Sequence, residues 1–498
     1  MKYLPTAVQM KQGDHDTITK YKMPSMVLME RASLIFTEIL GMQHVDCSNT
    51  LIVCGSGNNG GDGFAVARLL LQQGCNVTAL FAGSESSATG ETSLQMEIFK
   101  NYGGTIITTF PEDEYTVIID AVFGIGLSRE IEGHYRDIIE KMNRKNGFKA
   151  AVDIPSGVHA STGKVLGTAF QADLTVTFAC CKLGMVLYPG HLYAGKVITA
   201  DIGIPEFLFA QNKACPYTLE TGDINTLLPP RKPNSHKGTY GKLLMVTGSE
   251  GMAGAAFLSA KAAYTAGAGL VQIYTPKVNQ AVLQTLLPEA IITAYDHFDE
   301  ACIARLLEWA DVTAVGCGLG QSVLSRKLLE YIMVNAKCPL LVDADGLNLL
   351  SEHMELLSEK KEIILTPHMK ELSRLLHCSM EELSLDRIQK IRDFTEKYQV
   401  VCVSKDARTI VAEAGYGLFV NTAGNSSMAK AGSGDVLAGI TAGLMAQNMP
   451  LYDAAVLGVY LHACAGDYAK KKKGSYSVSA QDLIEEAGNV IKEHEEVN

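Results

Sequence analysis

The chain has 498 residues, of which 47% are hydrophobic and 19% charged, with 46 glycines and one tryptophan. At about 150 residues per domain, this length predicts two or three domains and excludes a single small binding module. The composition indicates an α/β protein rich in tight turns, neither disordered nor fibrous. A net charge of -11 argues against nucleic-acid binding, and the one basic run, residues 470–473, fits a solvated helix end better than a phosphate-binding patch.

The spacing of the cysteines and the lengths of the apolar runs indicate the cellular compartment of the protein. The twelve cysteines include no C-x-x-C pair and no cysteine–histidine spacing that would close a zinc site. Such scattered cysteines favour reduced thiols. The first twenty residues lack a signal-peptide core, and no run of eighteen uncharged apolar residues follows. We therefore expect a cytoplasmic protein that does not enter a membrane.

Prolines interrupt the chain between about residues 215 and 240, which places a domain boundary there. We predict a first domain over residues 1–215, a boundary region over 216–240 and a second domain over 225–498. On both sides, apolar runs end in glycine-rich turns and lead into helical patterns, the alternation that builds parallel sheets. Two α/β domains follow.

The predicted elements, in chain order, begin with a helix over residues 24–40. Strands follow in the first half at residues 51–54, 76–81, 117–120, 149–153 and 174–178. Strands follow in the second half at residues 243–247, 270–274, 312–316, 340–343, 363–365 and 400–404.

A glycine-rich turn over residues 55–63 lies between a buried strand and a helix predicted over 64–73. It fits the G-x-G-x-x-G pattern, in which bare backbone approaches a pyrophosphate at a helix N-terminus. Ordinary binding of a hydride-transfer cofactor is not supported, because the acidic residue expected at the end of the next strand is absent. Asn58, Asn59 and Asp62 place three polar side chains in this turn, although turn formation requires none of them. Alternatively, the asparagines tolerate left-handed conformations and Asp62 caps the helix.

Two more polar turns follow strands of the first half. Asp120 precedes a glycine turn at Gly124, and Asp153 opens the run Asp-Ile-Pro-Ser-Gly. In a parallel sheet, all three turns converge on the carboxyl edge of the strands, where ligands bind.

These three runs, in this order, resemble the NAD(P)HX epimerase family of the YjeF N-terminal type, over nearly all of residues 1–210. The resemblance implies a Rossmann-like three-layer sandwich. It implies a potassium ion held by Asn59, Asp120 and Ser156, and oxygen ligands suit such a hard cation. It also implies that hydrated NADH or NADPH contacts Asn58, Asn59, Gly60, Gly61, Asp62, Gly124, Ile125, Gly126, Leu127, Ser128, Arg129, Glu130 and Asp153.

Epimerisation at the hydrated carbon requires reversible loss and return of a hydroxyl, so a carboxylate beside the ring is a reasonable acid or base. We select Asp153 as the catalytic candidate. The alternative for Asp153 is strand-end solvation or helix capping.

In the second half, a Walker-type loop is excluded, because the nearest approach puts Val197 where a hydroxyl is needed. A better phosphate site is the turn Gly432, Ser433, Gly434 before a helix predicted over 436–447. Its amides would form an anion hole, strengthened by the helix dipole. Asp435 would sit beside it as the catalytic base, the alternative being a helix N-cap.

Four further polar turns follow strands, at residues 316–320, 343–346, 366–368 and 404–409. With residues 248–256 and 425–437 they resemble the ADP/ATP-dependent NAD(P)HX dehydratase of the ribokinase-like superfamily, over about 225–490. The resemblance implies contacts from Ala255, Gly318, His368 and Asp435 to the hydrated dinucleotide. It implies contacts to the adenine nucleotide from Lys405, Asp406, Ala407, Arg408, Thr409 and Gly434. Three departures stand out: Asp406 replaces the usual glycine, while Met369-Lys370 and Ser426-Ser427 each replace a Pro-Gly pair.

Several of these residues also have a purely structural interpretation. A lone histidine such as His368 is ordinarily structural. Asp343 and Asp345 fit equally well as ligands of magnesium or water near the phosphates and as caps of the helix at 347–350. Lys405 suits phosphate charge better than packing, because a buried unpaired ammonium is costly.

Together the two resemblances imply repair of hydrated nicotinamide nucleotides. Asp435 would promote phosphorylation of the hydrate hydroxyl, and phosphate elimination would then regenerate NADH or NADPH, with ADP or ATP as co-substrate and magnesium present. The first domain would supply the S epimer from the R epimer. We expect a homo-oligomer without nucleic-acid or membrane partners. The alternatives are a vitamin or sugar kinase fused to a nucleotide-binding or scaffold domain, or a non-catalytic sensor.

Overall fold

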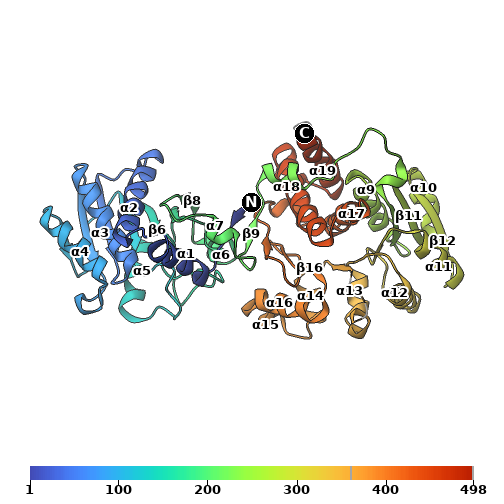
Figure 1. The fold of residues 1–498 in the computed structure, drawn as a ribbon, viewed down its shortest axis with the longest axis horizontal. Coiled ribbons are helices and arrows are strands. Elements are labelled where there is room, and N and C mark those ends of the chain that lie inside the picture. The colour runs from blue at the N-terminus through green and yellow to red at the C-terminus, as the bar shows by residue number, and fades with distance from the viewer. Residues whose placement is uncertain (359, 361, 496–498) are drawn as a thin grey trace. The chain divides into compact units, whose positions relative to one another are not determined.

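The computed structural model describes residues 1–358, 360 and 362–495. The chain divides into two compact units, Lys2–Tyr217 and the part from Thr218 onward (Figure 1). Both units are α/β, as the alternation of strands and helices predicts.

The first unit is built on a seven-stranded parallel sheet with the order β4-β3-β2-β5-β6-β7-β8. All five predicted strands are present, whereas the short strand β4 and the half-exposed strand β8 were not predicted. The strand bounds are β2 Asn49–Cys54, β3 Asn76–Phe81, β4 Thr105–Ile107, β5 Val117–Ala121, β6 Phe148–Val152, β7 Leu174–Phe178 and β8 Lys196–Ala200.

Helices cover both faces of this sheet. One buried cluster joins the sheet to α2 and α3 through residues such as Phe36 and Phe64, and a second joins the opposite face to α5 through Ile139. The result is a three-layer sandwich. The helices are α1 Ala7–Thr19, α2 Ser25–Met42, α3 Asn58–Gln72, α4 Gly90–Asn101, α5 Gly133–Arg144, α6 Leu183–Val186 and α7 Phe207–Ala210.

The second unit has a parallel sheet with the order β16-β15-β14-β13-β10-β11-β12, extended beyond β16 by antiparallel β17 and β18. The strands β12, β17 and β18 were not predicted. The strand bounds are β10 Lys242–Val246, β11 Leu270–Pro276, β12 Ile291–Tyr295, β13 Val312–Val315, β14 Leu340–Val342, β15 Ile363–Leu365, β16 Val401–Ser404, β17 Ile410–Ala412 and β18 Phe419–Val420. Two further short strands are β1 Lys2–Tyr3 and β9 Tyr217–Thr218.

Several predicted strand ends lie just beyond the strands. Asp153, Gly316 and Asp343 were expected inside strands, but each follows the last paired residue. Gly316 has a φ of 124° and Asp153 a φ of 67°, which turn the chain out of the sheet. These residues therefore begin the loops at the carboxyl edge.

Tight helix packing places α17 (Ser433–Ala446) within the second unit. A Cβ on Gly439 would lie 2.1 Å from the carbonyl oxygen of Ser259 in α9, so only glycine allows the two helices to approach this closely. The other helices are α8 Ile224–Leu227, α9 Ala253–Thr265, α10 Gln280–Leu286, α11 Glu300–Trp309, α12 Val323–Asn335, α13 Asp345–Leu350, α14 Met369–Leu375, α15 Met380–Leu385, α16 Arg387–Tyr398, α18 Leu451–Ser477 and α19 Ala480–Glu495.

The basic run at residues 470–473 directly precedes Gly474, whose φ of 73° interrupts α18, so the run lies at the end of a helical segment as predicted. Lys472 pairs with Glu486 at 2.7 Å and Lys473 with Asp482 at 2.5 Å, both acids being in α19. The run thus helps to join two helices. Among the described residues, no helix is both long and apolar enough to cross a membrane.

Candidate active sites

The first unit contains a cavity of about 740 Å³ at the carboxyl ends of its central strands. Most of the predicted nucleotide contacts line it, the exceptions being Gly60, Gly61 and Glu130. A Cβ on Gly60 would lie 1.9 Å from Gly55 O, and one on Gly61 would lie 2.7 Å from Met29, so both glycines serve close packing. The predicted residues that do line the cavity are Asn58, Asn59, Asp62, Gly124, Ile125, Gly126, Leu127, Ser128, Arg129 and Asp153.

The glycine-rich turn is shorter than predicted, because α3 begins at Asn58 rather than at residue 64. Asn58 and Asn59 are helical, so their left-handed alternative is wrong. No side chain caps this helix, so the capping alternative for Asp62 is wrong as well. The first amides of α3 therefore face the cavity region without a side-chain cap, which suits an anion.

Asp153 is held at the cavity by donors from β7 and the segment after it. Its Oδ1 accepts from Phe178 N at 3.0 Å, from the Thr177 hydroxyl at 3.3 Å and from Lys182 Nζ. Asp153 caps no helix, and its carboxylate is bonded to protein rather than merely solvated. The sequence analysis gave Lys182 no role, because nothing local shows that its ammonium meets Asp153.

Lys182 is almost wholly buried, with 1% of its surface exposed. Besides Asp153, its ammonium donates to the Thr177 hydroxyl at 2.9 Å and to Phe178 O at 3.0 Å. All three of its protons thus have acceptors, which is the condition for burying an ammonium. Lys182 also lines the cavity.

Asp120 and Ser156 meet as predicted. Ser156 donates to Asp120 through its hydroxyl and its amide, both at 2.7 Å, and Val122 N adds a third bond at 3.2 Å. Burial raises the pKa of Asp120 to about 6, although these bonds lower it in part. The buried amide nitrogen of Asn59 has no acceptor among the described residues. Asn59 also lies near this turn, with Oδ1 3.5 Å from the Cβ position of Gly124.

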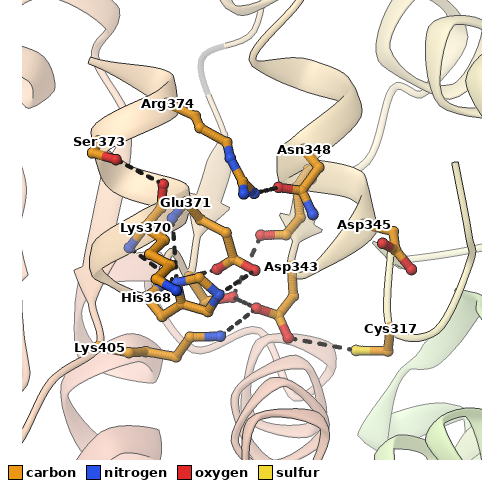
Figure 2. A network of polar contacts seen from close by, with 12 residues as sticks. Cys317, Asp343, Asp345, Asn348, His368, Lys370, Glu371, Ser373, Arg374 and Lys405 are labelled. Atoms are coloured by element: carbon orange, nitrogen blue, oxygen red, sulfur yellow. Dashed lines mark hydrogen bonds and ion pairs between the residues drawn. The ribbon is translucent and has the colours of Figure 1, made fainter. Parts of the chain in front are cut away.

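In the second unit, Lys405 and Asp343 form the centre of a polar network at the carboxyl edge (Figure 2). Lys405 Nζ lies 2.6 Å from Asp343 Oδ1, which also accepts from the Thr366 hydroxyl at 2.6 Å. The thiol of Cys317 lies 3.7 Å from Asp343 Oδ2. The ammonium of Lys405 is therefore paired with the carboxylate of Asp343. The cost of a buried unpaired ammonium, on which its predicted contact with phosphate rested, does not arise.

The helix α17 directs its first turn at this network. A Cβ on Gly434 would lie 3.5 Å from Lys405 Nζ, so the glycine and the ammonium are neighbours. The amide of Ser433 donates to Lys430 O at 3.3 Å, which removes it from the predicted anion hole. Within the described chain, the amides of Gly434 and Asp435 have no protein acceptor. The available anion hole is thus narrower than predicted.

Asp435 lies in the first turn of α17, whose N-cap is Gly432 with a φ of 89°, so the capping alternative for Asp435 is wrong. Burial, together with the charge of Asp343, raises the pKa of Asp435 to about 6. Hydrogen bonding to Cys317 and the charge of Lys405 act in the opposite direction. A carboxyl group with this pKa is mostly ionised at neutral pH and can accept a proton.

Ala255 and Gly318, both expected at the dinucleotide, lie against each other. Gly318 has a φ of 59°, and a Cβ there would come within 2.7 Å of Ala255 Cβ. Asp345 accepts from Gly320 N at 2.8 Å, and neither Asp343 nor Asp345 caps α13, so the capping alternative for both is wrong.

His368 begins α14 as its N-cap. Its Nδ1 accepts from the amides of Lys370 and Glu371 at 3.1 and 3.2 Å, so the ring proton is assigned to Nε2. Nε2 lies 3.2 Å from Glu371 Oε1, and His368 N donates to Glu371 Oε2 at 2.8 Å. Burial raises the pKa of Glu371 to about 7. The Nδ1 atom of His368 therefore has the expected structural role, as a helix cap, while half of the side chain stays exposed.

Arg387, which was not predicted to have a role, holds the predicted adenine-nucleotide segment through hydrogen bonds. Arg387 bonds Asp406 at 2.9 Å and Ser404 O at 2.7 Å. Asp406 O accepts from the Thr409 hydroxyl at 3.1 Å, and Arg408 donates to Thr422 O at 3.1 Å. The aspartate that replaces a glycine thus has a structural partner, and no local signal points from residue 387 to it.

The folds and sites define a class: a Rossmann-like unit followed by a ribokinase-like unit with an uncapped helix N-terminus beside a carboxylate. Over residues 25–184 the chain matches the family described as YjeF-related protein N-terminus, and over 243–489 the family described as NAD(P)H-hydrate dehydratase. A ribokinase-like superfamily protein from Enterococcus faecalis is 27% identical, with a TM-score of 0.52, over 56% of this chain and 96% of that one.

Full-length relatives define the family. A bifunctional NAD(P)H-hydrate repair enzyme from Moorella thermoacetica is 36% identical over 99% of this chain and 97% of its own length. Another from Escherichia coli is 34% identical over 97% of this chain and 93% of its own length. The chain belongs to the family of bifunctional NAD(P)H-hydrate repair enzymes, and the expected fold of each unit is confirmed.

Proposed function

We propose that the two units act in sequence on hydrated NADH and NADPH. The second unit dehydrates the S epimer at the expense of ADP or ATP, and the first unit converts the R epimer into the S epimer. The observation that carries the proposal is the meeting of Lys405, Gly434 and Asp435 at one sheet edge, each from a segment that the resemblance assigns to a ligand.

In the dehydratase reaction, a hydroxyl is converted into a better leaving group. Asp435 accepts the proton of the hydrate hydroxyl as its oxygen attacks the terminal phosphoryl group of the nucleotide. The free amides of Gly434 and Asp435, with the ammonium of Lys405, stabilise the transferred charge. AMP or ADP leaves as the phosphoryl group is transferred. Phosphate then departs from the nicotinamide carbon while the neighbouring ring carbon loses a proton to water, which leaves NADH or NADPH.

In the epimerase reaction, the dinucleotide occupies the cavity of the first unit, with its phosphates at the first turn of α3. Asp153 acts beside the hydrated ring as an acid or base. Its contacts with Lys182 and Phe178 N fix the carboxylate in one orientation.

A potassium ion fits the Asp120 turn. Asp120 and Ser156 contribute oxygens, and a 180° rotation of the Asn59 amide would exchange its unpaired nitrogen for an oxygen. A cation there would stabilise the buried carboxylate, whose pKa is otherwise raised. The ion would order the loop that carries the nucleotide contacts.

Magnesium would accompany the nucleotide. Asp343 and Asp345 already bond protein donors, so the phosphate oxygens would supply most of its ligands, as magnesium prefers. We also propose a homo-oligomer, which sedimentation analysis would test.

Purified epimers provide the test. Incubation of each epimer with ADP and magnesium should restore the absorbance of the reduced nicotinamide and release phosphate. A stable phosphomonoester would instead support a vitamin or sugar kinase. Retained ligand binding without turnover by the first unit would support a sensor.

A further inference from the structure

Two of the carboxyl groups that line the cavity of the first unit lie in contrasting surroundings. The Oδ1 atom of Asp153 accepts hydrogen bonds from an ammonium, an amide and a hydroxyl. Asp62 lines the same cavity from α3, and its carboxyl group makes no hydrogen bond or ion pair with any residue that the structure describes, whereas its backbone carbonyl oxygen accepts from the Ser33 hydroxyl at 3.2 Å. One group is fixed by donors and the other is unpaired.

The surroundings of Asp62 favour its neutral form. Burial raises the pKa of Asp62 well above its usual range, the charges of Asp153 and Asp14 raise it further, and Lys182 opposes them only in part. Asp14, from α1, lines the same cavity. A buried carboxyl group without donors, beside one that an ammonium, an amide and a hydroxyl hold, gives the site two carboxyl groups in different environments, an arrangement suited to an acid and a base.

We propose that Asp62 is the proton donor of epimerisation and that Asp153 is its partner base, an inference that rests on the proposed epimerase function. In one direction, the carboxylic acid of Asp62 protonates the hydroxyl on the hydrated nicotinamide carbon. The carbon–oxygen bond breaks, its electron pair leaves with water, and the ring nitrogen's lone pair forms a carbon–nitrogen double bond.

Water then adds to the opposite face of that double bond. The double-bond pair returns to nitrogen, and the proton of the added water passes to Asp153. The enzyme is left with an ionised Asp62 and a protonated Asp153, the state required for the reverse direction, and exchange with solvent restores the first state. The sequence needs no oxidant or reductant. Two groups suit an inversion, because the leaving and entering oxygens lie on opposite faces.

The substitution Asp62→Asn tests the donor role in the full chain. Because Asp62 is neutral before the reaction, asparagine retains its charge and shape and lacks only the transferable proton. We expect epimer interconversion to slow by about 100-fold or more. Dehydration of the S epimer by the same protein should stay unchanged, which shows that the second unit is intact. The matched control is Asp137→Asn on the exposed side of α5, which should interconvert the epimers at the wild-type rate.

The outcomes distinguish the proposed role of Asp62 from the proposed epimerase function on which it rests. If the wild type does not interconvert the epimers above the uncatalysed rate, the proposed epimerase function fails. If the wild type does and Asp62→Asn retains its rate, the inference alone is overturned. Asp62→Ala with added formate gives a second reading: recovery of the rate supports a missing proton donor, and an equally slow rate with formate contradicts it.

Discussion

Lys405 Nζ lies 2.6 Å from Asp343 Oδ1, and the Cβ position of Gly434 lies 3.5 Å from the same nitrogen. Lys405 thus contacts two structures at once, the buried carboxylate of Asp343 at the carboxyl edge of the sheet and the first turn of α17. Its removal should affect stability and nucleotide binding separately.

The substitution Lys405→Met leaves Asp343 buried without its cation. We expect a loss of about 3 kcal/mol in the free energy of unfolding, because breaking a buried pair strands the other charge. Asp343→Asn in the same chain should restore much of this stability without restoring ADP-dependent dehydration. Urea unfolding and phosphate release measure the two effects. Equal recovery of both would show that Lys405 is only structural.

Asp435→Asn should reduce dehydration by at least about 100-fold, because it removes the proposed base. Epimer interconversion in the same protein is the internal control and should not change. In the wild type, the pKa of Asp435 is raised to about 6. A base acts when ionised, so dehydratase activity should fall as the pH drops below about 6, which a pH–rate profile measures.

Two glycines of the second unit should respond differently to alanine. Gly434 has no positive φ and its added Cβ would meet Lys405 at an ordinary 3.5 Å, so Gly434→Ala should fold normally and weaken ADP binding. Gly318 has a φ of 59° and would clash with Ala255, so Gly318→Ala should lower the stability by about 1–3 kcal/mol. Calorimetric titration with ADP and thermal unfolding distinguish them. Unchanged ADP affinity in Gly434→Ala would place the nucleotide elsewhere.

Lys182→Met should slow epimerisation by displacing Asp153 rather than by removing a reacting group. The loss should appear in kcat and leave KM unchanged, and Lys182→Arg should recover part of kcat. A loss confined to KM would contradict this positioning role.

Glu371 should link stability to pH. Its pKa rises from an ordinary 4.5 to about 7 on folding, so the folded state favours the protonated form. The stabilisation of the folded state by protonated Glu371 is fully present below the pKa of the unfolded state. It is lost as the pH rises through about 7. Glu371→Gln should therefore lose less stability than the wild type between pH 5 and 8 in urea unfolding. An identical pH dependence would contradict this assignment.

The local elements were predictable because their signals are local. Apolar runs followed by glycine turns predicted all five central strands of the first unit and placed Asp120, Asp153 and Asp343 within one residue of a strand end. Short edge strands such as β4, β8 and β12 were missed, because a half-exposed run of three to five residues has little periodic signal.

The sequence by itself determined the motifs: glycine turns, strand-end carboxylates and the first turn of α17, each contained within about ten consecutive residues. Only the tertiary structure decided their partners. Lys405 meets Asp343 across 62 residues, Lys182 meets Asp153 across 29, and Arg387 meets Asp406 across 19. Such pairs depend on which strands are neighbours and on their register, and these are set by packing across the whole sheet rather than by any local pattern.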